Sequence, residues 1–202
     1  MIKPSVRRLR GFVWAIIAVA LLLPLVACAD EKADVTGDSG TALSNLAAAE
    51  SAAAALAPDV KLLVVQTGGM AQVGSDPVWV FIFGSPETGT MYTVSIVGGN
   101  VMDASEAGEA PLEDDEWDAV PDTAAWDIDS HEAYESALAV SGASGDPAGY
   151  SMLLETHVPR SSSAEPVVRP FVWYVAFDPG NSGATAGVIE VDARTGKASP
   201  VE

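Results

Sequence analysis

The chain has 202 residues, 28 acidic and 10 basic, with a net charge of −18 and a hydrophobic fraction of 49%. This much apolar content can build a folded core, so the composition argues against a disordered chain. The negative charge argues against nucleic acid as a partner, because phosphate binding needs clustered Lys and Arg. A single cysteine, Cys28, excludes an internal disulfide framework and a cysteine-based zinc cluster.

Residues 1–27 predict a secretory signal peptide. Four basic residues occur within the first ten, and an uncharged apolar run of 17 residues follows from Gly11 to Ala27. A basic start, an apolar run and a boundary of small residues is the pattern of such a signal. A transmembrane anchor is the alternative. The run is at the lower limit for spanning a bilayer, and Pro24 near its end fits a signal better.

The sequence Leu25-Val26-Ala27-Cys28 resembles the bacterial lipobox. In that family a diacylglycerol is attached to the cysteine sulfur, and the signal is cut just before the cysteine, here between Ala27 and Cys28. The resemblance implies a lipoprotein held at the cell membrane by lipid on Cys28, on the extracytoplasmic face. Residues 28–40 predict a flexible spacer, because they are rich in Asp and Gly and lack apolar periodicity.

The mature chain would be strongly acidic. Removal of residues 1–27 leaves six basic and 28 acidic side chains, a net charge of −22. No Lys or Arg occurs between Lys61 and Arg160. Such a surface repels anionic lipid headgroups and favours basic partners, so the lipid alone would hold the domain at the membrane.

The first folded unit is predicted over residues 41–102. An alanine-rich helix is expected first, with Thr41 as one candidate N-cap and Pro58 as its stop. Apolar, β-branched runs then predict strands. The expected ranges are 41–56 for the helix and 61–66, 77–83 and 90–97 for the strands, with a brief continuation at Val101 and Met102.

A second unit over residues 127–202 repeats this order after an acidic linker at 103–126. Asp129 and Glu132 form a capping-box pattern at the start of its helix. The helix is expected over 130–140, the strands over 150–157, 170–177 and 186–191, and a turn follows at Gly196.

The internal match predicts an α+β fold. Trp79 and Phe83 are four residues apart, as are Trp173 and Phe177, and each pair follows a proline and precedes a turn. A helix with three or four strands forms an antiparallel sheet with one helix packed across it. Each unit of roughly 60 residues buries little core alone. We therefore expect two tandem helix-on-sheet repeats side by side.

A Trp-x-x-x-Phe strand and a later strand ending in Val191-Asp192-Ala193-Arg194-Thr195-Gly196-Lys197 resemble PepSY-type, cystatin-like domains. The first unit departs from this pattern, with Val97-Gly98-Gly99-Asn100 in place of the Asp-x-x-Thr-Gly turn. The resemblance implies a binding or inhibitory role of the kind proposed for this family in secreted and envelope proteins, often towards peptidases.

Acidic side chains are densest between residues 113 and 129. A divalent cation site, with Ca²⁺ as the ion, is one interpretation, because Ca²⁺ binds six to eight oxygens. The spacing lacks the glycine and the final glutamate of an EF-hand loop, and Pro111 and Pro121 favour a linker. Trp117 and Trp126 are expected to fix this linker onto the domain.

Catalytic chemistry has few candidates. His131 lies in the first turn of a predicted helix and His157 in a loop, and no serine has a nucleophile-elbow spacing. Trp79 and Trp173 could form an aromatic binding platform or pack in the core, and their equivalent positions favour the core. A hydrolase using Glu155 and Asp129 would need both carboxylates in one pocket.

The leading hypothesis is a non-catalytic envelope lipoprotein that binds a protein or peptide, with no cofactor and no resident metal. A polar loop is the expected contact region, at Arg160, Ser161, Ser162 and Ser163. The alternatives are a binding protein for a divalent cation or small molecule and, less favoured, a hydrolase.

Overall fold

The computed structural model describes residues 40–142, 147–156, 170–178 and 187–201. All of them belong to the compact unit Lys32–Glu202. The helices are α2 (Ala42–Ala54), α3 (Ser130–Val140) and the short 3₁₀ turns η3 (Trp117–Ala119) and η4 (Thr123–Ala125). The strands are β1 (Lys61–Thr67), β2 (Ala71–Gln72), β3 (Trp79–Ser85), β4 (Thr90–Val97), β5 (Asn100–Glu109), β6 (Gly149–Thr156), β7 (Phe171–Asp178), β8 (Val188–Asp192) and β9 (Ala198–Pro200).

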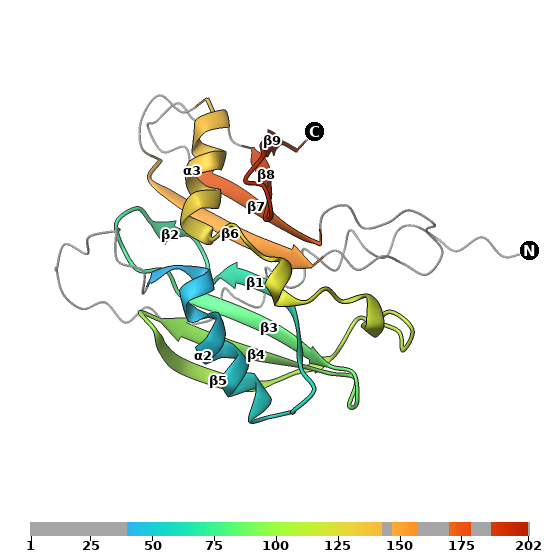
Figure 1. Ribbon diagram of the computed structural model, residues 1–202. Helices are drawn as coiled ribbons and strands as arrows, with labels where there is room; N and C mark the ends of the chain where they lie inside the picture. The colour runs from blue at the N-terminus through green and yellow to red at the C-terminus, as the bar shows by residue number, and fades with distance from the viewer. Residues whose placement is uncertain (1–39, 143–146, 157–169, 179–186, 202) are drawn as a thin grey trace, which may run out of the picture. The chain divides into compact units, whose positions relative to one another are not determined.

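The strands form one sheet (Figure 1), in the order β5-β4-β3-β1-β6-β7-β8-β9, with β2 paired to β6. Every pairing is antiparallel. In each half, the first strand of the chain, β1 or β6, lies at the centre of the sheet. The strands that follow it on the sheet path lie progressively farther out. The two halves therefore have the same order of elements, and they meet where β1 pairs with β6.

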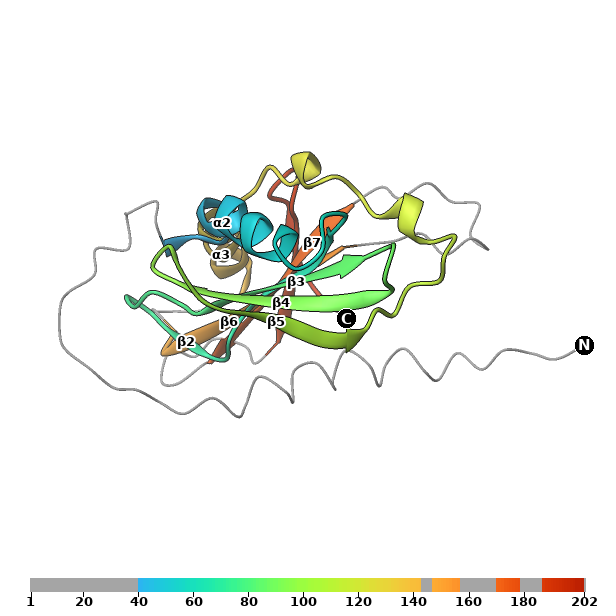
Figure 2. The same cartoon turned by 90° about the horizontal axis from the view of Figure 1, so that it is seen from below.

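Both helices cover the same face of this sheet (Figure 2). Helix α2 packs on β3, β4 and β5, and α3 packs on β7, β8 and β9. The predicted α+β class, with helices on an antiparallel sheet, is confirmed. The halves are not separate domains, because β1 and β6 make the sheet continuous.

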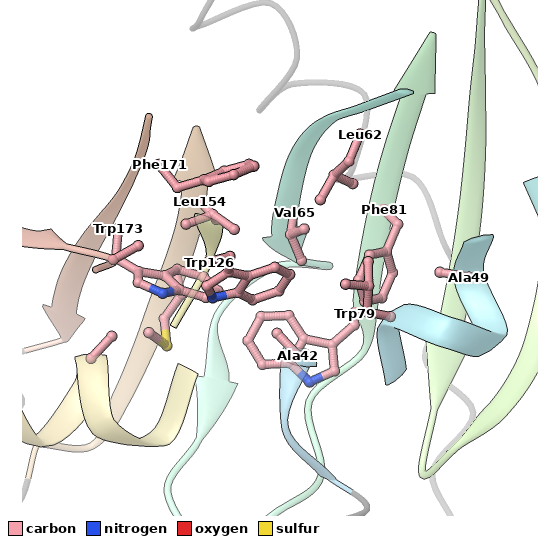
Figure 3. Close-up of a cluster of buried hydrophobic side chains, with 14 of the residues drawn as sticks. Ala42, Ala49, Leu62, Val65, Trp79, Phe81, Trp126, Leu154, Phe171 and Trp173 are labelled. Atoms are coloured by element: carbon pink, nitrogen blue, oxygen red, sulfur yellow. The ribbon is translucent and has the colours of Figure 1, made fainter. Parts of the chain in front are cut away.

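One core lies between the helices and the sheet. It contains Val65 and Phe81 from the first half and Leu154 and Trp173 from the second (Figure 3). The rings of Trp79 and Trp173 meet edge to face across the junction, with their centroids 6.2 Å apart. Trp126 adds a third indole, 5.7 Å from Trp173. These aromatic contacts join the two halves through apolar burial as well as through backbone pairing.

Trp79 and Trp173, both buried, bind the backbone just before the N-terminus of a helix in the same way. The indole N–H of Trp79 donates to the Gly40 carbonyl at 2.8 Å, and that of Trp173 donates to the Ile128 carbonyl at 3.0 Å. Each carbonyl belongs to the residue just before the helix N-cap. The core interpretation of both tryptophans is correct, with 2% and 0% exposure, and a surface platform of these two residues is wrong.

The predicted acidic linker over 103–126 is wrong in its first part. Residues Asn100–Glu109 form β5, a ten-residue edge strand paired to β4. Almost every side chain of β5 is exposed, and only Ala104 is partly buried. The strand therefore lacks the apolar alternation by which strands are identified from sequence. Its acidic residues suit an edge, because charge discourages pairing with other chains.

The remaining segment, residues 110–126, is held onto the domain by Trp117 and Trp126, the two residues expected to fix it. Trp117 is 5% exposed and packs with Leu63 and Val120, while Trp126 enters the main core. The Lys61 ammonium donates to the Trp117 carbonyl at 2.7 Å. Thr123 donates to Glu50 of α2 at 3.3 Å.

Among the described residues, no helix has the length and apolar character needed to cross a membrane. The predicted signal peptide and residues 28–39 of the predicted spacer, with Ala27 and Cys28, lie outside the described residues.

Candidate functional site

A solvent-open pocket lies where the two helices begin. Its volume is about 100 Å³. The wall and floor come from both halves of the sheet, from both helix starts and from the connection between β1 and β3. Among the residues that line the pocket, those with polar or aromatic side chains include Thr41, Asp76, Trp79, Ser130, Tyr134 and Tyr150.

The helix starts meet here because they share one capping group. The Asp129 carboxylate accepts from Ser130 N at its own helix and from Leu43 N of α2, the latter at 2.9 Å. The Ser130 hydroxyl accepts from Ala42 N at 3.0 Å. Glu132 completes the predicted capping box by accepting from the Asp129 amide at 3.2 Å. One aspartate therefore caps α3 and binds α2, 86 residues away in sequence.

These caps decide the electrostatic character of the pocket. Free N–H groups at a helix start favour an anion. Here the amides of Ala42, Leu43 and Ser130 already have side-chain acceptors, and one of these acceptors is the Asp129 carboxylate. The N-termini of the two helices are therefore already capped by the Asp129 carboxylate, and they do not form an anion site.

Two tyrosines form the aromatic wall. The rings of Tyr134 on α3 and Tyr150 on β6 lie 4.9 Å apart, and Tyr134 also packs edge to face on Phe177 at 5.5 Å. Burial raises the pKa of the Tyr150 phenol, and the nearby Tyr134 and Asp76 raise it further. Tyr150 therefore stays neutral at physiological pH and offers a ring face and a hydroxyl.

Asp76 lies at the edge of the pocket, on the chain between β2 and β3. Its side chain is exposed, and no hydrogen bond or ion pair links its carboxylate to another described residue. A Cβ placed on Gly40 would lie 2.8 Å from Asp76 Oδ1, so Gly40 leaves room for this carboxylate. The short pairing of β2 with the start of β6 holds the connection against the pocket.

His131 lies on the rim, as a surface residue of the first turn of α3. Its Nε2 lies 3.3 Å from the Glu135 carboxylate, and both side chains are well exposed. Tyr134, Asp76 and Ser130 line the same pocket, but no hydrogen bond joins His131 to a serine among the described residues.

The other predicted site residues are not brought together. Arg160, Ser161, Ser162 and Ser163 lie outside the described residues, as does His157. Glu155 follows the buried Leu154 on β6, so it points to the face of the sheet opposite the helices. Asp129 lies on the helix side as a cap. The pair proposed for a hydrolase is therefore separated by the sheet.

The acidic segment has no clustered ligand set. Among the described residues, no group of three or more His, Cys, Asp or Glu side chains is placed to hold a metal ion. Asp122 instead caps η4 by accepting from Ala124 N at 2.8 Å, and Glu116 accepts from Glu113 N at 3.0 Å.

The pocket itself was missed from sequence. Its main residues, Thr41, Asp76, Tyr134 and Tyr150, come from four separate segments. A partial signal existed, since Asp76 and Pro77 form a polar turn just before the first Trp strand. The pairing of β1 and β2 with β6 brings that turn to the second helix.

Comparison with known proteins finds similarity at the level of the fold. No protein-family model matches the chain, and no curated protein matches it. The fold is similar to the crystal structure of a "putative lipoprotein" from Clostridium difficile 630, with a TM-score of 0.50 and 11% identity. The likeness covers 85% of this chain and 99% of that one. At this identity it shows a shared fold.

Proposed function

We propose that this protein is an extracytoplasmic lipoprotein, anchored through Cys28, whose folded domain binds a protein or peptide and does not catalyse a reaction. The observation that carries the anchoring is the position of the only cysteine. Cys28 directly follows Leu25-Val26-Ala27 at the end of an apolar run with a basic start. The fold likeness to a protein described as a lipoprotein supports the same proposal.

The fold supports the finer assignment to tandem PepSY-like units. Each half has one helix followed by a strand, the Trp strand and further strands outward. The Asp192 carboxylate accepts from Arg194 N at 3.0 Å and Thr195 N at 2.9 Å, which forms the turn of the Asp-x-x-Thr-Gly pattern. In the first half, a two-residue Gly98-Gly99 turn with positive φ at both residues takes its place. We assign both halves to this class of binding module.

Binding is supported by the acidic charge and by the open pocket. Within the described residues, Lys and Arg occur only at Lys61, Arg194 and Lys197. The domain would attract basic polypeptides at long range, and this attraction would weaken as salt rises.

The anchoring is tested by fatty-acid labelling of cells that express the full chain. The Cys28→Ala protein should carry no label and keep its signal segment, because the acceptor sulfur is lost. The Thr36→Ala protein, changed in the predicted spacer, should be labelled like the unaltered chain. Label that persists in Cys28→Ala would overturn lipidation at this residue.

A further inference from the structure

We propose that the pocket at the helix starts binds a lysine or arginine side chain of the partner. This inference rests on the proposed binding function and names the place and the chemistry of contact. The pocket volume of about 100 Å³ is well below the roughly 300–1,000 Å³ of small-molecule sites. It therefore suits one extended side chain of a partner and not a whole ligand.

The walls fit the two parts of such a side chain. The aliphatic stem of Lys or Arg packs on apolar surface while its charged end stays hydrated. The buried Trp79 and Met152 give an apolar floor, and Tyr134 and Tyr150 give aromatic faces beside it. A cation near an aromatic face is attracted by the ring quadrupole.

Asp76 supplies the matching charge at the mouth. Its carboxylate is exposed and has no hydrogen bond or ion pair to another described residue, so no described group competes with a partner's cation for it. Burial is the main cause of the raised pKa of Tyr150, and Tyr134 and Asp76 raise it further, in keeping with the place of all three residues on one pocket wall. An anion is disfavoured for the reason given above, since the helix-start amides already have acceptors.

The basic residues of the described chain lie away from this mouth. Lys61 is at the start of β1, whereas the pocket is near the end of β1, where Thr67 pairs with Trp79. Arg194 and Lys197 follow β8, whose end pairs with the start of β7 and so lies away from Tyr150. His131 is the nearest titratable base, and it faces Glu135. No described Lys or Arg therefore competes for the pocket.

The test uses saturation-transfer NMR on the full chain in non-ionic detergent. The probes are the tripeptide N-acetyl-Gly-Lys-Gly-amide and the same peptide with an acetylated, uncharged lysine. We expect binding of the first and at least tenfold weaker binding of the second. Asp76→Asn should weaken binding of the lysine peptide about twofold to fivefold, the range for an exposed ion pair. Asp115→Asn, a matched change in an exposed acid of the segment before Trp117, should change it less than twofold.

Equal binding of the two peptides, equal effects of the two variants, or absence of lysine-peptide binding would each overturn the pocket assignment. A twelve-residue Lys-Gly repeat, measured by fluorescence anisotropy at low and physiological salt, separates this from the wider proposal. Salt-sensitive binding of the repeat that Asp76→Asn does not weaken would mean that a basic partner binds at a surface other than the pocket. Tripeptide binding at Asp76 without binding of the repeat would keep the pocket and reject the polypeptide-binding function.

Discussion

Asp129 connects the two halves through a single carboxylate. In sequence it is a helix N-cap with Glu132 three residues on, and the structure confirms that capping box. Its second bond, to Leu43 N of the other helix, has no sequence signal because 86 residues separate the partners. A residue with an ordinary local role thus acquires a long-range one through the way the halves pair.

Asp129→Ala should lower the free energy of unfolding by about 2 kcal/mol, since it removes a helix cap and a charged hydrogen bond to a second helix. Urea denaturation of the full chain, followed by circular dichroism, measures the change. Asp127→Ala is the matched control, because Asp127 is exposed and its side chain makes no hydrogen bond or ion pair with another described residue. It should alter stability by less than about 0.5 kcal/mol. Equal effects of the two variants would contradict the double-capping role.

At the scale of elements, the sequence predicts those helices and strands whose buried residues recur at a regular spacing. Strand β4 was predicted over 90–97 and has those bounds, and α2 lies within the expected 41–56. The prediction failed for β5, whose side chains are exposed on both faces, and for the short β2 and β9. An edge strand is held in place by backbone hydrogen bonds to its neighbour, and these bonds do not require a hydrophobic pattern in the sequence.

The same limit applies to the candidate site. Trp79, Trp173 and Asp129 could be assigned to core and cap because their roles are local to one unit. The pocket depends on the β1–β6 pairing, which no local pattern encodes. Arg160 stands out in the sequence as a cation in an acidic chain, whereas Asp76 is one acid among many, so the pattern favours the Arg160 loop as the contact region.

The segment 110–126 offers a prediction at this scale. Gly84 on β3 leaves room for the Trp117 ring, since a Cβ there would lie 2.5 Å from Trp117 Cη2 and 2.9 Å from Leu63 Cδ1. Gly84→Ala should cost about 1–3 kcal/mol, as for overpacked cores, and should release the segment from the sheet. Faster amide hydrogen exchange at residues 113–120 would report that release.

Gly187→Ala is the control for this prediction, because a Cβ at Gly187 meets nothing within 4 Å. It should leave exchange in the segment unchanged. If Gly84→Ala destabilised the fold without altering exchange at 113–120, Trp117 would not be what holds the segment in place.

At the scale of the whole molecule, two halves with the same element order depend on one core. Each half has one strand edge at the junction, β1 in the first half and β6 in the second, and this edge is paired only by the other half. Residues from both halves share the main cluster, and the Trp79–Trp173 contact crosses the junction. This arrangement predicts a single cooperative unfolding transition, since loss of one half exposes the edge and the core of the other.

Val65→Ala tests this dependence at the junction. Val65 is fully buried on β1 and pairs with Leu154 of β6. The loss of two methyl groups and the cavity left behind should cost about 2 kcal/mol.

Because the core is shared, we expect amide exchange governed by global opening to accelerate by a similar factor in β3 and in β7. Val101→Ala, at a 43% exposed site on edge strand β5, should leave both rates nearly unchanged. Acceleration confined to β3, or two separate unfolding transitions, would mean that the halves fold independently and that the junction is only a contact between them.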